Sequence, residues 1–274
     1  MIGFIGLGNM ASAMIGGMLQ KDMVTPGEII GSCRTEETAQ KIADRFGIET
    51  TTDNSIVAQA ADILILAVKP QFFPEVIARI KDEVNADALI ISIAAGKTMD
   101  YIETQFGRPL KLVRCMPNVP ALVGEGITSV SRNERVSDEE MKQAMDLLSG
   151  MGKTSEIPER LIDAVVGVSG SSPAYVFLFI EAMADGAVAA GMPRSQAYEF
   201  AAQAVLGSAR MVLETGRHPG ELKDMVCSPG GTTIQAVKVL EEKGFRAAVM
   251  DAMEACIEKS KNLQPLDVVV CNKI

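Results

Sequence analysis

Two glycine-rich turns carry the residue types and spacing that could do chemistry. The first, Gly6-Leu7-Gly8-Asn9-Met10-Ala11, follows an apolar run and precedes a helix-like stretch. Its first glycine permits a tight turn, its second leaves room for a pyrophosphate, and its alanine lets a helix pack close to a strand. Phosphates would lie at a helix N-terminus, where free N–H groups favour anions. The pattern predicts a dinucleotide site, and a ligand-free turn is the alternative.

The residues after the second expected strand indicate which dinucleotide is bound. An NAD site usually has an acid there that binds the ribose 2′-hydroxyl, but the chain reads Ser32-Cys33-Arg34-Thr35. Arg34 can bind a 2′-phosphate, with Ser32 and Thr35 as hydroxyl donors. The residues favour NADPH without excluding NADH. The alternative is that Arg34 is a solvated arginine at a helix start.

Two further loops lie where a bound nicotinamide would pass. Ala67-Val68-Lys69-Pro70 follows an expected strand over 63–68, and Ala94-Ala95-Gly96 follows one over 89–93. Both come at the carboxyl ends of parallel strands, where open α/β sheets bind ligands. Their small residues leave room for a ring. The alternative is that Pro70 and Gly96 only end the strands.

The second turn, Ser228-Pro229-Gly230-Gly231-Thr232-Thr233, lies between two expected helices. Its N–H groups and hydroxyls could hold a carboxylate, and a helix–helix turn with threonine caps is the alternative. His218, the only histidine, precedes a proline and is expected to cap a helix rather than act as a base. Reduction of a cationic imine needs no general acid at the carbon that receives hydride, so positioning could do most of the work.

The elements that must position these turns follow two patterns. In the first half, apolar strand-like runs alternate with helix-like stretches, which predicts a parallel sheet covered on both faces. The expected strands are 1–5, 28–32, 63–68, 89–93, 110–115 and 153–157, and the expected helices are 9–21, 36–46, 73–83, 99–106 and 137–151. Beyond residue 158 only helices are expected, over 173–190, 194–215, 220–226, 233–243 and 245–261. The predicted architecture is an α/β Rossmann-type domain over 1–158 followed by an all-α domain over 159–274.

Composition limits the classes of function. The 274 residues carry a net charge of −9, which argues against nucleic-acid binding. Five scattered cysteines without a CxxC pair suit a reducing compartment, and the lone histidine makes a metal site unexpected. No signal peptide is visible and no window is expected to be apolar enough to span a bilayer, which predicts a cytoplasmic protein.

The helices of the second half are rich in small apolar residues. Alanine is dense over 182–190 and 201–209, with interspersed glycine. Small residues let helices approach closely, and a helical domain of this size has trouble burying so much apolar surface alone. We therefore expect a second subunit against this face, and an ordinary helical core is the alternative.

Taken together, these motifs resemble those of the pyrroline-5-carboxylate reductases. Matching sequence runs along nearly all of residues 1–262, including Phe4–Met10, Ala67–Pro70 and Arg114–Asn118, and is most specific from His218 through Asp224 into the turn that ends at Thr233. The resemblance implies reduction of 1-pyrroline-5-carboxylate to proline by NADPH or NADH, the last step of proline biosynthesis. It also implies a homodimer with interleaved helical domains, often assembled further into a ring of dimers.

The resemblance implies roles for individual residues. The nucleotide contacts would be Gly6, Leu7, Gly8, Asn9, Met10, Ala11, Ser32, Arg34, Asn54, Ala67, Val68, Lys69, Pro70 and Ala95. The substrate contacts would be Glu159, Met225, Gly230, Gly231, Thr232 and Thr233, with Thr233 as the catalytic residue that hydrogen-bonds the ring nitrogen. Ser172 stands where the family usually has a glycine. The tail 264–274 has no clear counterpart and could form a stray strand or a disordered end.

Two other functions are weighed against this one. A β-hydroxyacid dehydrogenase shares the opening motif and a helical second domain, but it would also carry a Lys-x-x-x-Asn pair on a helix after the Rossmann domain. The only such spacing, Lys81 to Asn85, falls in the wrong domain. A non-enzymatic NADP-binding oligomer could dispense with the turn over 228–233, so the intact turn argues against it.

Overall fold

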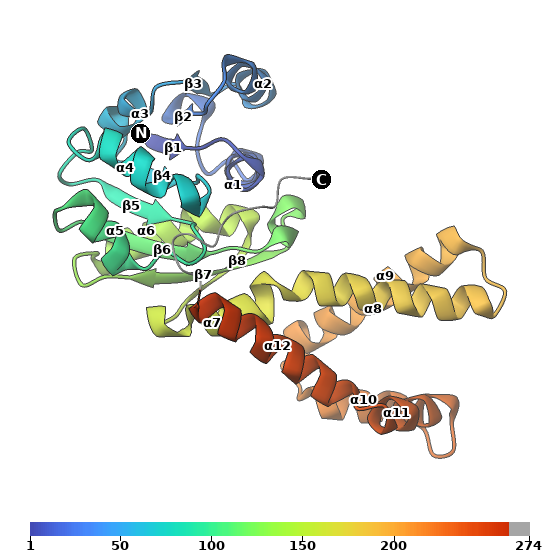
Figure 1. Cartoon of the computed structure of the whole chain (residues 1–274). Helices are drawn as coiled ribbons and strands as arrows, with labels where there is room; N and C mark the ends of the chain where they lie inside the picture. The colour runs from blue at the N-terminus through green and yellow to red at the C-terminus, as the bar shows by residue number, and fades with distance from the viewer. Residues whose placement is uncertain (263–274) are drawn as a thin grey trace. The chain divides into compact units, whose positions relative to one another are not determined.

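The computed structural model of the protein describes residues 1–262 and divides into two compact units. One unit contains Met1–Gly170 together with the chain from Cys256 on, and the other contains Ser171–Ala255. Figure 1 labels the helices and strands of both units. The tail over 264–274, including its expected stray strand, lies outside the described residues.

A single sheet forms the centre of the first unit. Its strands are β1 (Ile2–Ile5), β2 (Ile29–Ser32), β3 (Glu49–Thr51), β4 (Ile63–Leu66), β5 (Leu89–Ser92), β6 (Lys111–Met116), β7 (Gly126–Arg132) and β8 (Gly152–Glu156). They are ordered β3-β2-β1-β4-β5-β6-β7-β8, and every neighbouring pair is parallel except β6 with β7 (Figure 1). The predicted Rossmann-type architecture with a parallel sheet is confirmed.

Helices cover both faces of this sheet. They are α1 (Asn9–Gln20), α2 (Glu36–Phe46), α3 (Asn54–Ala60), α4 (Phe73–Ile80), α5 (Met99–Phe106), α6 (Asp138–Leu148) and α7 (Ile162–Val165). One apolar core joins the sheet to α1, α2 and α6, and the other joins it to α3, α4 and α5. Phe4 lies in the first core and Ile5 in the second, because successive side chains of a strand point to opposite faces.

Short turns complete the first unit. The 3-10 turns are η1 (Pro26–Glu28), η2 (Pro70–Phe72), η3 (Val119–Val123), η4 (Ser149–Met151) and η5 (Glu159–Leu161), and η6 (Val166–Gly170) is a π-helical turn. The expected helices over 73–83 and 137–151 end earlier than predicted, at Ile80 and Leu148. The last residues of both predicted helices fall in less regular turns.

Two strands and two helices were not predicted. Strand β3 is a three-residue edge strand of polar residues, and α3 and α7 are only seven and four residues long. Strand β7 lies in a stretch rich in glycine and proline, and its buried positions include Thr128, Ser129 and Ser131. The connection from β6 to β7 is short, and because a parallel crossover needs a dozen or more residues, these two strands pair antiparallel.

The second unit is helical. Its helices are α8 (Ser172–Ala189), α9 (Arg194–Thr215), α10 (Pro219–Val226), α11 (Thr232–Glu242) and most of α12 (Phe245–Lys261). The all-α prediction for this region is confirmed, and each helix lies within two residues of its expected bounds. Helix α8 begins at Ser172, with Ser171 as its N-cap between the π-helical turn η6 and the helix.

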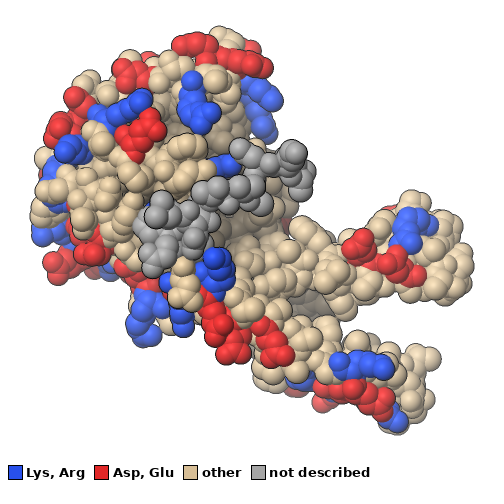
Figure 2. Space-filling view, in the orientation of Figure 1, with Lys and Arg blue, Asp and Glu red and all other residues tan. Residues whose placement is uncertain are grey.

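Much of the apolar surface of these helices is exposed in a single chain. Phe177, Leu178 and Phe200 are 60%, 67% and 66% exposed. Figure 2 shows mostly uncharged surface over the helices of the second unit. Exposed apolar patches of this kind mark interaction surfaces.

The stretch Glu159–Ala189 corrects one prediction. By length and composition it could cross a membrane, with a mean hydropathy of 1.4, so the expectation that no window is that apolar is wrong. The acids Glu181 and Asp185 lie within this stretch and still leave a sufficiently apolar window. One such stretch is weak evidence for a membrane, because helices buried in soluble proteins pass the same test.

A pair of neighbouring glycines in α1 tests the packing of the first unit. A Cβ at Gly17 would lie 2.3 Å from the carbonyl oxygen of Gly150. We expect Gly17→Ala to lower the free energy of unfolding by about 1–3 kcal/mol, since the backbones must separate. A Cβ at Gly16 would meet only the Phe46 ring, at 3.4 Å, so Gly16→Ala should be neutral or stabilising by up to about 1 kcal/mol. Urea denaturation measures both, and equal effects would contradict the assigned contact.

Candidate active site

The first glycine turn joins β1 to α1 and is shaped by two different glycines. Gly6 has φ +97°, and a Cβ there would lie 2.9 Å from the backbone of Ala67. Gly8 precedes α1, has ordinary φ, and has open space where a Cβ would be, with no side chain capping the helix. Gly6 is therefore required by the fold, whereas the space at Gly8 and the free N–H groups of α1 suit a phosphate.

A groove of about 660 Å³ opens at this turn. It lies at the carboxyl ends of β1, β2 and β4, where open α/β sheets bind ligands. Among the expected nucleotide contacts, those that line it are Gly6, Leu7, Gly8, Ser32, Arg34, Asn54, Ala67, Val68 and Lys69. Asn9, Met10, Ala11, Pro70 and Ala95 do not line it, and Ala11 is buried where α1 packs on the sheet.

Several groove residues were missed by the sequence reasoning. They are Cys33, Thr38, Thr52, Gln71, Phe72, Glu75, Val76 and Arg79. Most of them continue the loops and helices already singled out after β2 and β4. Extending each predicted loop by one or two helical turns would have found all but Thr52 and Arg79.

The polar side chains of the groove have defined partners. The Ser32 side chain is fully buried, and its Oγ donates a hydrogen bond to Asn54 Oδ1 at 2.7 Å. Thr35 caps α2 by accepting a hydrogen bond from the Thr38 N–H. Burial raises the pKa of the Cys33 thiol. Because the Ser32 hydrogen is already used, Ser32 positions Asn54 in this structure rather than offering a donor to the groove.

Glu159 links three parts of the first unit. Its Oε1 accepts hydrogen bonds from the Met99 N–H and from the Arg114 guanidinium, both at 2.8 Å. Met99 begins α5, directly after the loop that contains Ala95. The Arg114 side chain is only 8% exposed, so the carboxylate neutralises a buried cation. Glu159 therefore fixes the end of the loop beyond β5.

Lys97, which sequence reasoning missed, lies in the same loop. It is only 4% exposed, and its ammonium lies 4.2 Å from the centroid of the Tyr101 ring. Burial lowers the pKa of Lys97. Within residues 1–262 it makes no ion pair. No signal in the sequence distinguishes this lysine from a solvated one.

The second glycine turn begins α11. Gly230 has φ +69°, and the Gly231 N–H donates to the Ser228 carbonyl at 3.0 Å. Thr232 and Thr233 form the first turn of α11, and no side chain caps it. The N–H groups at the start of this helix can thus donate hydrogen bonds to a bound anion. Met225, 59% exposed, lies at the end of α10 before the turn.

His218 caps a helix. Its Nδ1 accepts a hydrogen bond from the Gly220 N–H at 3.1 Å at the start of α10, which confirms the capping role expected from the sequence. Residues 1–262 contain no group of three histidine, cysteine or acidic side chains arranged to hold a metal ion.

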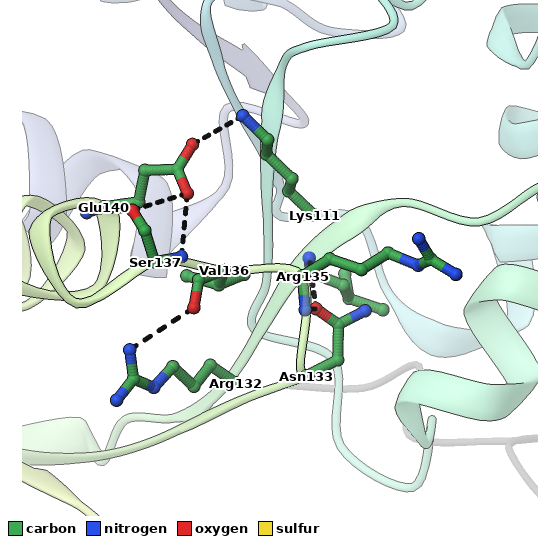
Figure 3. Close-up of polar contacts among 8 residues, drawn as sticks. Lys111, Arg132, Asn133, Arg135, Val136, Ser137 and Glu140 are labelled. Atoms are coloured by element: carbon green, nitrogen blue, oxygen red, sulfur yellow. Dashed lines mark hydrogen bonds and ion pairs between the residues drawn. The ribbon is translucent and has the colours of Figure 1, made fainter.

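A separate polar cluster lies at the amino ends of the parallel strands, away from the groove (Figure 3). Lys111 donates to Glu140 at 2.7 Å, and Glu140 also accepts from the Ser137 N–H. The Lys111 ammonium lowers the pKa of the Glu140 carboxyl. Arg132 donates to the Val136 carbonyl. These partners close the connection between β7 and α6, so the cluster is structural.

The fold and the groove define a class of protein. A Rossmann-type sheet with an open glycine turn and an arginine after its second strand is typical of an NADP-dependent oxidoreductase. Residues 1–96 match a family described as "NADP oxidoreductase coenzyme F420-dependent", and residues 159–263 match "Pyrroline-5-carboxylate reductase dimerisation". The chain belongs to the pyrroline-5-carboxylate reductase family, which confirms the resemblance found in the sequence.

Its relatives cover the chain almost completely. Pyrroline-5-carboxylate reductase of Escherichia coli K12 is 54% identical, and that of Methanosarcina acetivorans is 47% identical, each over 96% of this chain and 97% of the relative. The Coxiella burnetii reductase structure matches with TM-score 0.90 and 36% identity, over 95% of this chain and 97% of that one. A Plasmodium falciparum pyrroline carboxylate reductase with NADP bound matches with TM-score 0.84 and 33% identity, over the same shares.

Removing the charge of Glu159 tests its link to Arg114. We expect Glu159→Gln to lower the free energy of unfolding by about 2–4 kcal/mol, because it leaves a buried guanidinium without its counter-charge. The matched control is Asp146→Asn, which breaks the exposed Lys142–Asp146 pair and should change it by at most about 0.5 kcal/mol. Thermal and urea unfolding measure both variants. A Glu159→Gln protein as stable as the control would contradict the structural role.

Proposed function

We propose that this enzyme reduces 1-pyrroline-5-carboxylate to L-proline with NADPH, the final step of proline biosynthesis. The observation that carries the proposal is the match to pyrroline-5-carboxylate reductases along 96% of the chain. The open groove at the glycine turn, with Arg34 at its edge, fits a dinucleotide with a 2′-phosphate. NADH is the alternative cofactor in this proposal.

The groove residues orient the cofactor in this proposal. Bound NADPH supplies the hydride for the imine carbon. The turn from Gly6 to Gly8 contacts the pyrophosphate, and Ser32, Arg34 and Asn54 define the adenosine end. The loop Ala67–Pro70 and Ala95 lie beside the nicotinamide. The support is that most of these residues share one groove at the strand ends.

The second turn binds the substrate in this proposal. The N–H groups at Gly230 and Thr232 hold the carboxylate, Gly231 shapes the turn through its bond to Ser228, and the Thr233 hydroxyl hydrogen-bonds the ring nitrogen. Met225 and Glu159 lie near the ring. The uncapped start of α11 supports this assignment. The imine arrives protonated at nitrogen, so the carbon that receives hydride needs no acid, and positioning supplies most of the rate.

We also propose which part of the chain binds each ligand and how the chains assemble. Residues 1–158 bind the dinucleotide, and residues 159–274 bind the substrate. Residues 159–274 also form a homodimer with interleaved helical domains, and these dimers assemble further into a ring. The exposed apolar side chains of α8 and α9 and the match to a dimerisation family support the dimer. The enzyme is proposed to act in the cytoplasm.

A steady-state assay tests reaction, substrate and cofactor together. Purified protein is given 1-pyrroline-5-carboxylate with NADPH or NADH, and oxidation of 3-hydroxyacids with NADP⁺ is measured in parallel. We expect reduction of the imine with a higher kcat/KM for NADPH. Oxidation of a 3-hydroxyacid without imine reduction would favour a β-hydroxyacid dehydrogenase, and nucleotide binding without turnover would favour a non-enzymatic protein.

Thr233→Ala tests the catalytic assignment. We expect kcat to fall about 10- to 100-fold, the value of a hydrogen bond to a charged group, while the Kd of NADPH changes little. The control is Thr215→Ala, which removes a threonine hydroxyl that bonds the Met211 carbonyl within α9. Loss of turnover and of NADPH affinity by the same factor would contradict the role of Thr233.

A further inference from the structure

Arg34 and Phe72 come from opposite sides of the first glycine turn and contact each other. Arg34 follows β2, Phe72 ends η2 after β4, and β1 lies between these strands in the sheet. The Arg34 Cζ is 5.4 Å from the centroid of the Phe72 ring, and both residues line the groove. The contact therefore connects the two walls of the groove.

The partner of Arg34 is an aromatic ring and not an acid. A ring attracts a cation through its quadrupole and, unlike a carboxylate, brings no negative charge of its own. Within residues 1–262, no carboxylate pairs with Arg34. Two acids of this region are engaged elsewhere, since Glu75 pairs with Arg79 at 2.7 Å and Glu36 accepts from Thr52 at 3.0 Å. The guanidinium is thus held in place with its charge uncompensated.

Phe72 is well placed to hold this guanidinium. Its ring packs against the apolar core formed by α3, α4 and α5, so it offers a fixed surface. An exposed arginine loses side-chain entropy when a ligand orders it. A ring that already restricts the guanidinium lowers that loss and makes binding of an anion more favourable.

We propose that Phe72 is a positioning residue that holds Arg34 for the 2′-phosphate of NADPH and thereby raises the preference for NADPH over NADH. The inference rests on the proposed function, because it assumes that the groove binds a nicotinamide dinucleotide. NADH has no 2′-phosphate, so a change at Phe72 acts on one cofactor and not on the other.

Two substitutions at Phe72 separate its ring from its apolar bulk. Phe72→Leu keeps an apolar side chain against the core but removes the ring, and Phe72→Tyr keeps the ring. We expect Phe72→Leu to raise both KM for NADPH and the Kd of NADPH measured by calorimetry without substrate about two- to fivefold, the size of an exposed cation–π contact. KM for NADH should not rise with it, and Phe72→Tyr should restore the NADPH value. A proportional rise for both cofactors, or none, would overturn the inference.

A double-mutant cycle assigns the effect to Arg34. Arg34→Ala should lower the NADPH preference strongly, and adding Phe72→Leu to Arg34→Ala should change KM for NADPH no further. The control is Phe46→Leu, which removes a ring that lies outside the groove, with its centroid 4.7 Å from the Arg45 Cζ. This control should not change the ratio of KM for NADPH to KM for NADH.

The cycle distinguishes two kinds of failure. If Arg34→Ala leaves the NADPH preference intact, the proposed cofactor assignment fails, and the inference fails with it. If Arg34→Ala lowers the preference but Phe72→Leu does not, or if Phe72→Leu acts equally in both backgrounds, the inference alone fails.

Discussion

The close approach of two backbones at Gly6 is the constraint on which the nucleotide site depends. A side chain at this position would collide with the backbone of Ala67, and φ +97° is a conformation that few residues other than glycine adopt. The approach brings the end of β1 and the loop after β4 together at the floor of the groove. At Gly31, on the other side, a Cβ would lie 2.6 Å from the end of the Leu7 side chain, a contact that this side chain can relieve by moving. The shape of the groove therefore depends most on Gly6.

An acidic chain must still attract a cofactor that is itself an anion. The net charge is −9, so the overall field opposes binding, and the attraction has to be local. The structure supplies it with backbone N–H groups at the start of α1 and with one guanidinium whose charge is not compensated by an acid. Local donors of this kind also discriminate between ligands, since they act only on the phosphate they touch.

The parts of the fold that sequence reasoning predicted are those that local pattern determines. The strands β1, β4 and β5 are continuous apolar runs, and the turn after β1 has a specific glycine spacing. These strands and this turn can therefore be recognised from short segments of the sequence. Strand β7 was missed because its interior positions hold serine and threonine, whose burial depends on strands far away in the chain. The link from Glu159 to Met99 and Arg114 joins residues 60 and 45 positions apart, and no periodicity encodes such a pairing. The groove was predicted in outline because loops at strand ends converge, whereas the contact between Phe72 and Arg34 depends on tertiary packing.

The apolar stretch Glu159–Ala189 shows why composition alone misjudges a helix. Helices that are apolar on every side are buried either in lipid or in protein, and hydropathy does not separate the two. Here only 11% of the apolar window is buried within its own chain, yet the same residues begin the match to a dimerisation family. A π-helical turn and Pro173 also interrupt the regular α-helix within the first half of the stretch. Burial against a second copy of the chain covers the apolar side chains without lipid, so assembly accounts for the membrane-like composition.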